Sequence, residues 1–382
     1  MEVRPVQKVV DGAKKRQEEE VNFACVLFFV LAGAAVTDMT LALCVTGSVL
    51  SYHAFLMETV RSQKRLWSLS VFFFLGLGFL AKGPVTVVMF GIPVFLWTLI
   101  HRRWATLKDH SWWVGIPLFL VLTVPWFSLA EIRNPGFLKY FFYNENLLRF
   151  VTHEYGDLYG RGHTLPYGVA IPMLLISGFP WTLWCGVHIF TRQGWKRFTG
   201  SLRDERISLF TLSLMGITLF LCFARQLLLT YLLPVLPFLV IWGARFLKNS
   251  GVTRKAMIRV SVAAVIVYGL AYPLVLPQAE TRSTKGLIRL ARETKTRLSL
   301  DGGLIFVSGT PYSAYFYAHD FVLPFARKGA VINISKSLVS GKGHLYVIPR
   351  KIQDKIPSQI MDRLKPVGTL DDWILYQASP TS

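Results

Sequence analysis

Charged residues are scarce in this sequence. They make up 17% of its 382 residues, whereas 52% of the residues are apolar and 14% are aromatic. A soluble chain of this length, which would form two or three domains, has about 25% charged residues. The composition therefore argues against a purely soluble protein and predicts an integral membrane protein.

Cysteine is also rare, and the four cysteines all lie inside apolar runs. They are Cys25, Cys44, Cys185 and Cys222. Neither a disulfide framework nor a zinc site is indicated by this placement. No cleavable signal peptide is visible, because the first twenty residues are charged throughout.

The common soluble catalytic motifs are missing. The sequence has no P-loop, no G-x-G-x-x-G, no H-E-x-x-H and no G-x-S-x-G. It also lacks a soluble D-x-D site of the kind that holds a nucleotide-sugar diphosphate through a divalent ion. If the protein is a transferase, its donor is therefore expected to be carried on a lipid.

The net charge is strongly positive, at +20. The basic residues occur in short clusters between apolar runs and do not form one continuous patch with interleaved aromatics. This distribution argues against nucleic-acid binding and is typical of membrane topology signals.

Nine apolar segments follow a polar N-terminal stretch of residues 1–20. They run at about 21–36, 39–57, 66–81, 84–100, 112–130, 166–190, 207–224, 227–247 and 256–277. Several approach the ~20 residues that cross a bilayer as a helix, while the first and third are short. We therefore predict a transmembrane domain of about nine spans over residues 21–277.

The bias of Lys and Arg between alternate connections predicts the orientation. The richer set of connections holds Arg61, Lys64, Arg65, Arg102, Arg103, Lys108, Arg192, Lys196, Arg197, Arg203, Arg206, Arg245, Lys248, Arg254, Lys255 and Arg259. The poorer set holds Lys82, Arg133, Lys139, Arg149, Arg161 and Arg225. The richer set is predicted to be cytoplasmic, which places Asp38 and the loop of residues 131–167 on the outer side.

The outer loop of residues 131–167 is the longest polar-bearing segment between two apolar runs. Lys139, Asn146 and Arg149 are spaced to share one side of a helix, whose other faces are apolar. That pattern is typical of a helix lying in the membrane interface. The alternative is a loop that only anchors the flanking spans.

Residues 278–382 differ in character from the rest of the chain. The runs GGLIFVSG, HLYVIP and WILYQA predict strands, and TRSTKGLIRLARETKTRL, PYSAYFYAH and KIQDKIPSQIMDRL predict helices. We predict an extracytoplasmic α/β domain after the last span.

Two charged residues stand at the borders of predicted spans. Asp38 is isolated between apolar runs; it is a functional candidate, although an Asp there also suits a helix N-cap. Lys82 precedes Gly83 and Pro84 at the break of a hydrophobic hairpin, where a cation can hold a phosphate or only snorkel to the surface.

Arg225 lies at the outer junction of two spans, with Tyr231 a short distance along the chain. An Arg at that depth needs an anionic partner, either a lipid phosphate or a loop carboxylate in an internal ion pair. His153 and His163 have acidic neighbours but lack a regular ligand spacing, so no metal site is predicted.

Several runs together resemble a known superfamily. VTDMTLAL, FLAKGPV, VPWFSLAEIRNPGFLKYFFYNENLLRF and LTYLLPVLPFLVIWGARFL are similar to the bacterial aminoarabinose-to-lipid-A transferases and the wider dolichyl-phosphate-mannose protein mannosyltransferases. The resemblance covers most of residues 21–277. The tail after residue 278 is similar to the soluble outer domain that closes such proteins.

The resemblance implies a C-type glycosyltransferase, which takes a sugar from polyprenyl phosphate on the outer face and passes it to a lipid or protein acceptor. Asp38 matches an acidic position of the superfamily and is the candidate catalytic residue. The positions matching donor phosphate-binding or nearby polar groups are Lys82, Arg149, Arg225 and Tyr231. The candidate acceptor or loop residues are Glu131, Arg133, Asn134, Glu145 and Asn146. No cofactor is implied with certainty, and a divalent cation stays open.

Three departures from the superfamily pattern stand out. The further first span and the outer loop that carries the acidic base are absent from this chain, which leads us to expect truncation, a partner chain that supplies this part, or inactivity. Asn146 follows Glu145 where His is common. Leu227, Leu228 and Leu229 replace the usual Lys-Leu-Pro, so that Arg225 would supply the missing cation.

The resulting prediction is a multi-pass glycosyltransferase of the cell inner membrane that uses a polyprenyl-phosphate sugar. A transporter or flippase for a lipid phosphate is the rival, but it would need polar residues through the spans, and the segments at 66–80 and 84–100 offer few. A third reading is a non-catalytic membrane scaffold whose tail binds a partner.

Overall fold

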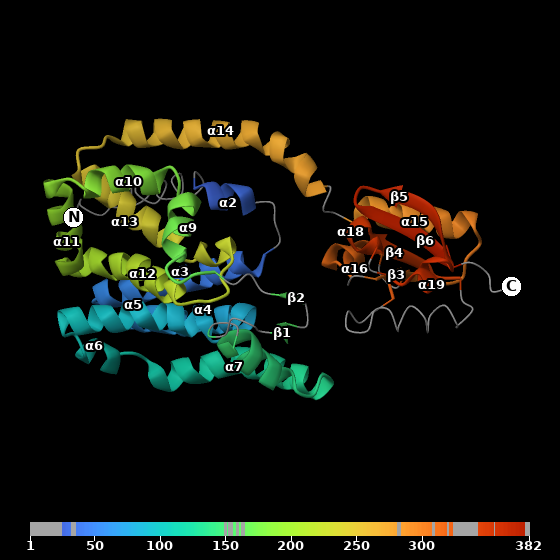
Figure 1. Ribbon diagram of the computed structural model, residues 1–382. Coiled ribbons are helices and arrows are strands. Elements are labelled where there is room, and N and C mark those ends of the chain that lie inside the picture. The colour runs from blue at the N-terminus through green and yellow to red at the C-terminus, as the bar shows by residue number, and fades with distance from the viewer. Residues whose placement is uncertain are drawn as a thin grey trace. The chain divides into compact units, whose positions relative to one another are not determined.

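The computed structural model describes residues 25–31, 36–148, 151, 156–157, 160–161, 165–280, 284–307, 310–318, 321–323, 343–354 and 356–378. The chain divides into two compact units, Met1–Gly269 and Leu270–Ser382 (Figure 1). The first is helical and the second contains a small sheet. This arrangement confirms the predicted fold class, a multi-span helical membrane protein with a small C-terminal α/β part.

The first unit is built from helices of very different lengths. They are α2 (Val26–Leu31), α3 (Thr37–Met57), α4 (Arg61–Lys82), α5 (Val85–His101), α6 (Ala105–Lys108), α7 (Trp112–Arg133), the π-helix η1 (Lys139–Leu148), α9 (Ala170–Ser177), α10 (Trp181–Ile189), α11 (Arg192–Arg203), α12 (Glu205–Cys222), the 3-10 helix η2 (Leu229–Leu232), α13 (Leu236–Asn249) and α14 (Arg254–Glu280). A hairpin of two short strands, β1 (Gly156–Asp157) and β2 (Gly160–Arg161), lies within residues 131–167. Helix α14 continues past the boundary into the second unit.

Within the described residues, four helices are long and apolar enough to cross a membrane, namely α3, α4, α7 and α12. Counting the bent pair of α9 and α10 as one span raises the number to five, and α5 is a shorter apolar helix. The count of nine therefore stays a prediction. Segment 166–190, predicted as one run, is instead two helices at 113° to each other. Pro180 stands at the break and cannot donate a backbone hydrogen bond to continue the first helix.

Glycine allows the spans to approach closely. A Cβ on Gly78 of α4 would lie 2.4 Å from a side-chain atom of Thr86 and 2.9 Å from Cys44. Similarly, a Cβ on Gly115 of α7 would lie 2.1 Å from the ring of Phe72. Small residues at helix interfaces are typical of membrane bundles, where dispersion contacts between close backbones drive association.

The helices differ in how far they are buried. In α12, 72% of the most apolar 18-residue stretch is buried inside the protein, whereas in α7 only 17% of that stretch is buried. Helix α7 therefore lies at the periphery and exposes large apolar side chains, among them Trp113, Val121, Trp126 and Ile132. An apolar surface of this extent is stable in lipid and costly in water.

The second unit contains a four-stranded sheet in the order β3-β4-β6-β5. Its strands are β3 (Leu304–Phe306), β4 (Leu345–Pro349), β5 (Leu364–Leu370) and β6 (Trp373–Ala378), and its helices are α15 (Lys285–Arg297), α16 (Tyr312–Ala318), α18 (Arg350–Gln353) and α19 (Ser358–Met361). β3 and β4 are parallel, and the β4–β6 and β6–β5 pairs are antiparallel.

Both faces of this sheet are covered. Alternate residues of β3 and β4 point to opposite sides, so that Phe306 and Val347 join the core beneath α15 while Ile305 and Tyr346 join the core beneath α19. This arrangement explains why β3 and β4 are apolar at every position.

The predicted strands at GGLIFVSG, HLYVIP and WILYQA are present, but the helix predicted over KIQDKIPSQIMDRL is wrong. It is replaced by two single turns, α18 and α19, separated around Pro357. Strand β5 was missed, because Pro366 and Gly368 weaken its pattern. They lie on an edge strand at a register shift, where both residues are tolerated.

Asp301 provides a pH-dependent contact in the second unit. Its Oδ1 accepts a hydrogen bond from the backbone N–H of Gly343 at 3.2 Å. Backbone hydrogen bonds, with smaller contributions from His344 and Lys295, lower the pKa of Asp301. A lowered pKa means that the ionised carboxylate stabilises the folded state above the unfolded pKa, and that this contribution is lost as the pH falls through the folded pKa.

We therefore expect Asp301→Asn to reduce amide protection in the second unit at pH 6 and to have no effect below the lowered pKa of Asp301. Hydrogen-exchange mass spectrometry of the full chain, comparing peptides that cover β3 and β4 in the two proteins at each pH, measures the difference. A difference that is the same at pH 3 and pH 6 would contradict the assignment.

Candidate functional site

The site begins at a sharp corner between α4 and α5. Lys82 is the last residue of α4, and Gly83 caps it with a φ of +71° while its N–H donates to the carbonyl of Phe79 at 2.7 Å. A Cβ at this position would be strained and would lie 2.7 Å from the ring of Phe141. Glycine therefore lets η1 pack directly on the corner that presents Lys82.

Lys82 is held by two contacts from distant parts of the chain. Its Nζ donates to Oδ1 of Asp38 at 2.5 Å, and Asp38, in the first turn of α3, is only 6% exposed. The same Nζ lies 3.9 Å from the ring centroid of Tyr231 in η2. The carboxylate and the aromatic face both stabilise the cation and fix its position.

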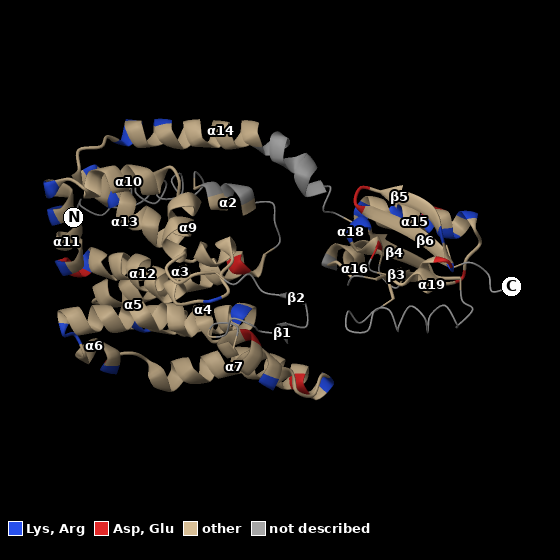
Figure 2. Ribbon diagram, in the orientation of Figure 1, with Lys and Arg blue, Asp and Glu red and all other residues tan. Residues whose placement is uncertain are grey.

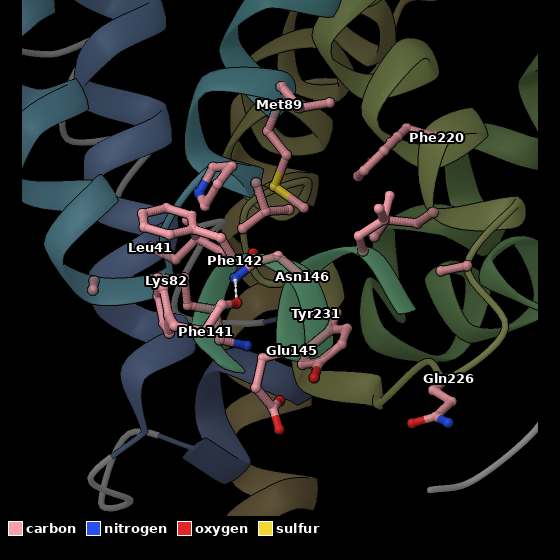
Figure 3. A pocket seen from close by; sticks show the side chains of 17 residues that line it. Leu41, Lys82, Met89, Phe141, Phe142, Glu145, Asn146, Phe220, Gln226 and Tyr231 are labelled. Carbon is pink, nitrogen blue, oxygen red and sulfur yellow. Dashed lines mark hydrogen bonds between the residues drawn. The ribbon is translucent and has the colours of Figure 1, made fainter. Parts of the chain in front are cut away.

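Lys82 borders a cavity of about 630 Å³. The polar residues of the lining are Lys82, Glu145, Asn146, Gln226 and Tyr231. The apolar residues are Leu41, Ala81, Pro84, Val85, Val88, Met89, Phe141, Phe142, Leu147, Phe220, Leu221 and Ala224. Figure 3 shows the labelled polar side chains Lys82, Glu145, Asn146 and Tyr231 near one another, with Met89 and Phe220 farther off. The cavity is thus amphiphilic, with few polar groups and a mainly apolar wall.

One wall of the cavity is the π-helix η1, within the loop of residues 131–167. Within it, the hydroxyl of Tyr140 donates to Oε1 of Glu145 at 2.6 Å, and Nδ2 of Asn146 donates to the carbonyl of Phe141 at 2.8 Å. The predicted helix is present over Lys139–Leu148, but it is a π-helix and not an ordinary α-helix. The wider turn of a π-helix changes which residues share a face, so that Asn146 lines the cavity while Lys139 is exposed.

The other outer-loop candidates have different environments. Glu131 accepts hydrogen bonds from the backbone N–H groups of Gly136 at 2.9 Å and Leu138 at 2.8 Å, and so closes the turn after α7. Arg133 and Asn134 are exposed and do not line the cavity. Of the five predicted loop residues, the structure therefore brings only Glu145 and Asn146 to the cavity.

Arg225 is near the cavity in sequence but is not among its lining residues. Its guanidinium lies 3.4 Å from the ring centroid of Tyr167, and its buried Nε has no hydrogen-bond partner among the described residues. The next residue, Gln226, does line the cavity, and its Nε2 is likewise buried without a partner within the described part of the chain. Arg149 lies outside the described residues.

Sequence reasoning missed Gln226 and Tyr140. Gln226 is a lone amide in an apolar run, which is a signal of the same kind that singled out Arg225. Tyr140 carried no signal, because its role depends on a hydrogen bond that only the π-helical turn permits. No three His, Cys, Asp or Glu side chains gather into a metal-binding group in the described ranges.

Sequence comparison finds a matching family and several similar proteins. Residues 25–141 match the family described as dolichyl-phosphate-mannose-protein mannosyltransferase. The undecaprenyl phosphate-alpha-4-amino-4-deoxy-L-arabinose arabinosyl transferase of Pectobacterium atrosepticum is 27% identical over 252 residues, which are 65% of this chain and 43% of that protein. Arabinosyl transferase 1 of Proteus mirabilis is 26% identical over 335 residues, 86% of this chain and 56% of the relative. The chain thus spans about half the length of the curated relatives it matches.

Structural comparison finds the same fold. The crystal structure of ArnT from Cupriavidus metallidurans bound to undecaprenyl phosphate superimposes with a TM-score of 0.75 at 16% identity, covering 95% of this chain and 79% of that one. The apo structure of the same protein gives a TM-score of 0.72 at 15% identity. The matching family and the relatives agree with the superfamily resemblance predicted from the sequence, and the solved structures agree with its fold.

Proposed function

We propose, from its relationship to the superfamily of the dolichyl-phosphate-mannose-protein mannosyltransferases, that this chain is a membrane glycosyltransferase. It takes a sugar from a polyprenyl-phosphate donor and transfers it to a lipid, such as one resembling lipid A, or to a protein. The reaction takes place on the outer face of the cell inner membrane. The uneven distribution of Lys and Arg between alternate connections supports this orientation.

The cavity beside Lys82 is the observation that carries the proposal. A polyprenyl phosphate has a phosphate head and a long apolar chain. The cavity offers a fixed cation and a small set of polar groups beside a wall of Val85, Val88, Met89 and similar side chains. Next to Lys82, a phosphate would be stabilised by the lysine cation. The isoprenoid chain would pack against the apolar wall.

The proposed chemistry is a single displacement. An oxygen of the acceptor attacks the anomeric carbon, the bond from that carbon to the phosphate oxygen breaks, and the phosphate leaves with the electron pair. The proton of the acceptor passes to a carboxylate. Lys82 stabilises the charge that develops on the phosphate in a site where apolar walls exclude water.

The other candidates have supporting roles in this proposal. Asp38 is assigned as a positioning residue, because its carboxylate holds Lys82 and it is not among the lining residues of the cavity. Glu145 is the one carboxylate among the described residues that line the cavity, and we assign it as the alternative proton acceptor. Arg225 could approach the phosphate only by leaving its stack on Tyr167, and Arg149 is proposed as a further cation from the loop.

A transfer assay tests the function. Membranes that contain the full chain are incubated with polyprenyl phosphate carrying a labelled sugar, and the label is followed into the lipid and protein fractions. We expect the label to leave the donor with release of polyprenyl phosphate, in proportion to the amount of chain. Tight binding of the donor without any transfer would instead identify a binding or transport protein and overturn the proposal.

A further inference from the structure

A second cavity lies at the end of the bundle opposite to Lys82. It has a volume of about 530 Å³ and is lined by Phe55, Arg61, Lys64, Arg65, Asp109, His110, Ser111, Trp112, Trp113 and Val114. Arg61 begins α4 and Lys82 ends it, and 22 helical residues span about 33 Å. The two cavities therefore lie at opposite ends of α4, about one bilayer thickness apart.

Cations predominate in the second cavity. Arg61 and Arg65 are exposed, and Lys64 pairs with Asp109 at 3.3 Å. The lining thus contains three basic side chains and one carboxylate, that of Asp109. Figure 2 shows that this end of the first unit, where α6 and α11 lie, is rich in Lys and Arg. The lining therefore has the charge to bind an anion.

His110 supplies an unsatisfied polar atom in the same lining. The residue is 7% exposed, its ring stacks on that of Phe55 at 4.6 Å between centroids, and its Nδ1 is hydrogen-bonded to the hydroxyl of Ser68. Its Nε2 is buried and has no partner within the described residues. Such atoms are rare in native proteins.

The protonation of His110 indicates what this atom requires. Burial and the nearby Lys64 lower the pKa of His110 to about 4, so the ring is neutral at physiological pH. Ser68 already accepts the N–H of Ser111 at 2.9 Å. In the tautomer in which the Ser68 hydroxyl donates to Nδ1, the neutral ring carries its proton on Nε2, and that N–H needs an acceptor oxygen.

The aromatic part of the lining indicates that the anion belongs to a lipid. Trp112 and Trp113 begin α7, and Trp113 is 95% exposed. Tryptophan is typical of the level of lipid headgroups. From there, the exposed apolar face of α7 continues along the bundle, where an acyl chain can pack.

We propose that this second cavity binds the headgroup of an anionic glycerophospholipid. Arg61, Lys64 and Arg65 contact the phosphate, His110 donates to one of its oxygens or to the adjoining ester, and Trp113 covers the glycerol region. The site is separate from the proposed donor site and would hold the helix bundle at a fixed depth in the membrane.

Lipid titration tests this proposal. The full chain in a neutral detergent is titrated with short-chain phosphatidylglycerol or phosphatidylcholine, and bound lipids are counted by native mass spectrometry. We expect Arg61→Gln/Arg65→Gln to weaken phosphatidylglycerol binding about tenfold, since each basic side chain contributes to attraction of an anionic headgroup. Both side chains are exposed, so thermal unfolding should be unchanged.

The matched control is Arg192→Gln/Lys196→Gln. These exposed residues on α11 change the net charge equally but lie outside the cavity. Arg103 pairs with Glu205, next to the end of α11, at 3.0 Å, so α11 lies at the same end of the bundle as α6. The control should alter binding less than twofold. Equal losses of phosphatidylglycerol affinity in the two double variants, or no loss in Arg61→Gln/Arg65→Gln, would overturn the proposal. Displacement of the lipid by inorganic phosphate at similar concentrations would also overturn it, because the site would then bind free phosphate.

Discussion

Replacing Lys82 with methionine is expected to lower the rate of sugar transfer about a hundredfold or more. Lys82 is the only basic side chain that lines the cavity among the described residues, and it is held by Asp38 and the ring of Tyr231. Removing one donor to a developing oxyanion typically costs about 100- to 1,000-fold in kcat. Steady-state kinetics with a labelled polyprenyl-phosphate sugar measure the loss.

A second variant separates the loss of chemistry from a loss of folding. Lys82→Met alone leaves the buried carboxylate of Asp38 without its partner, which destabilises a protein by about 3–5 kcal/mol. Lys82→Met/Asp38→Asn removes both charges and should restore thermal stability but not transfer. Lys82→Arg keeps the cation and should retain part of the activity. Transfer at the wild-type rate by the doubly neutral variant would refute the role of Lys82.

Asp38→Asn is expected to reduce kcat/KM for the donor about a hundredfold, with changes in both KM and kcat. The amide has nearly the same shape as the carboxylate but no charge, so Lys82 loses the charged partner that positions it. A displaced phosphate-binding cation weakens donor binding and also stabilises the transition state less well. The kinetic constants and their pH profiles are measured with the labelled donor.

The pattern of this loss separates positioning from proton transfer. If Asp38 were the catalytic base, Asp38→Asn would lower kcat by about 100- to 10,000-fold, leave the donor KM unchanged and remove the acidic limb of the pH profile. Full transfer by the variant would exclude both roles. In the positioning role, Asp38→Glu should recover part of the lost kcat/KM, and the effects of Asp38→Asn and Lys82→Met should be strongly non-additive.

Much of the fold could be predicted from local pattern. The apolar runs around α3, α4, α7 and α12 predicted spans, because a helix that crosses lipid must be apolar over its length. Gly83 and Pro84 marked the corner after α4. In the second unit, short β-rich runs predicted three of the four strands. Each of these signals arises from residues that are close together in the sequence, so it can be recognised without knowledge of the fold.

Other features depend on packing between distant segments. The sharp bend between α9 and α10 and the π-helical form of η1 were not predicted, since the same residues are compatible with straighter α-helices. The stack of Arg225 on Tyr167 joins residues far apart in the chain. Without the fold, an isolated arginine in an apolar run can be assigned equally well to a phosphate, a carboxylate or an aromatic ring.

The sequence by itself determined that this chain is a membrane protein, that α4 ends at Gly83 and Pro84, and which few charged residues are candidates for chemistry, because hydropathy and turn residues act locally. Only the tertiary structure decided that Asp38 and Lys82 form a pair and that Tyr231, Glu145 and Asn146 share a cavity with that lysine. It also decided that a second, basic cavity lies at the other end of α4. Side-chain convergence depends on how helices cross and rotate, which is set by the packing of small residues such as Gly78 and Gly115 and is not visible in any one segment.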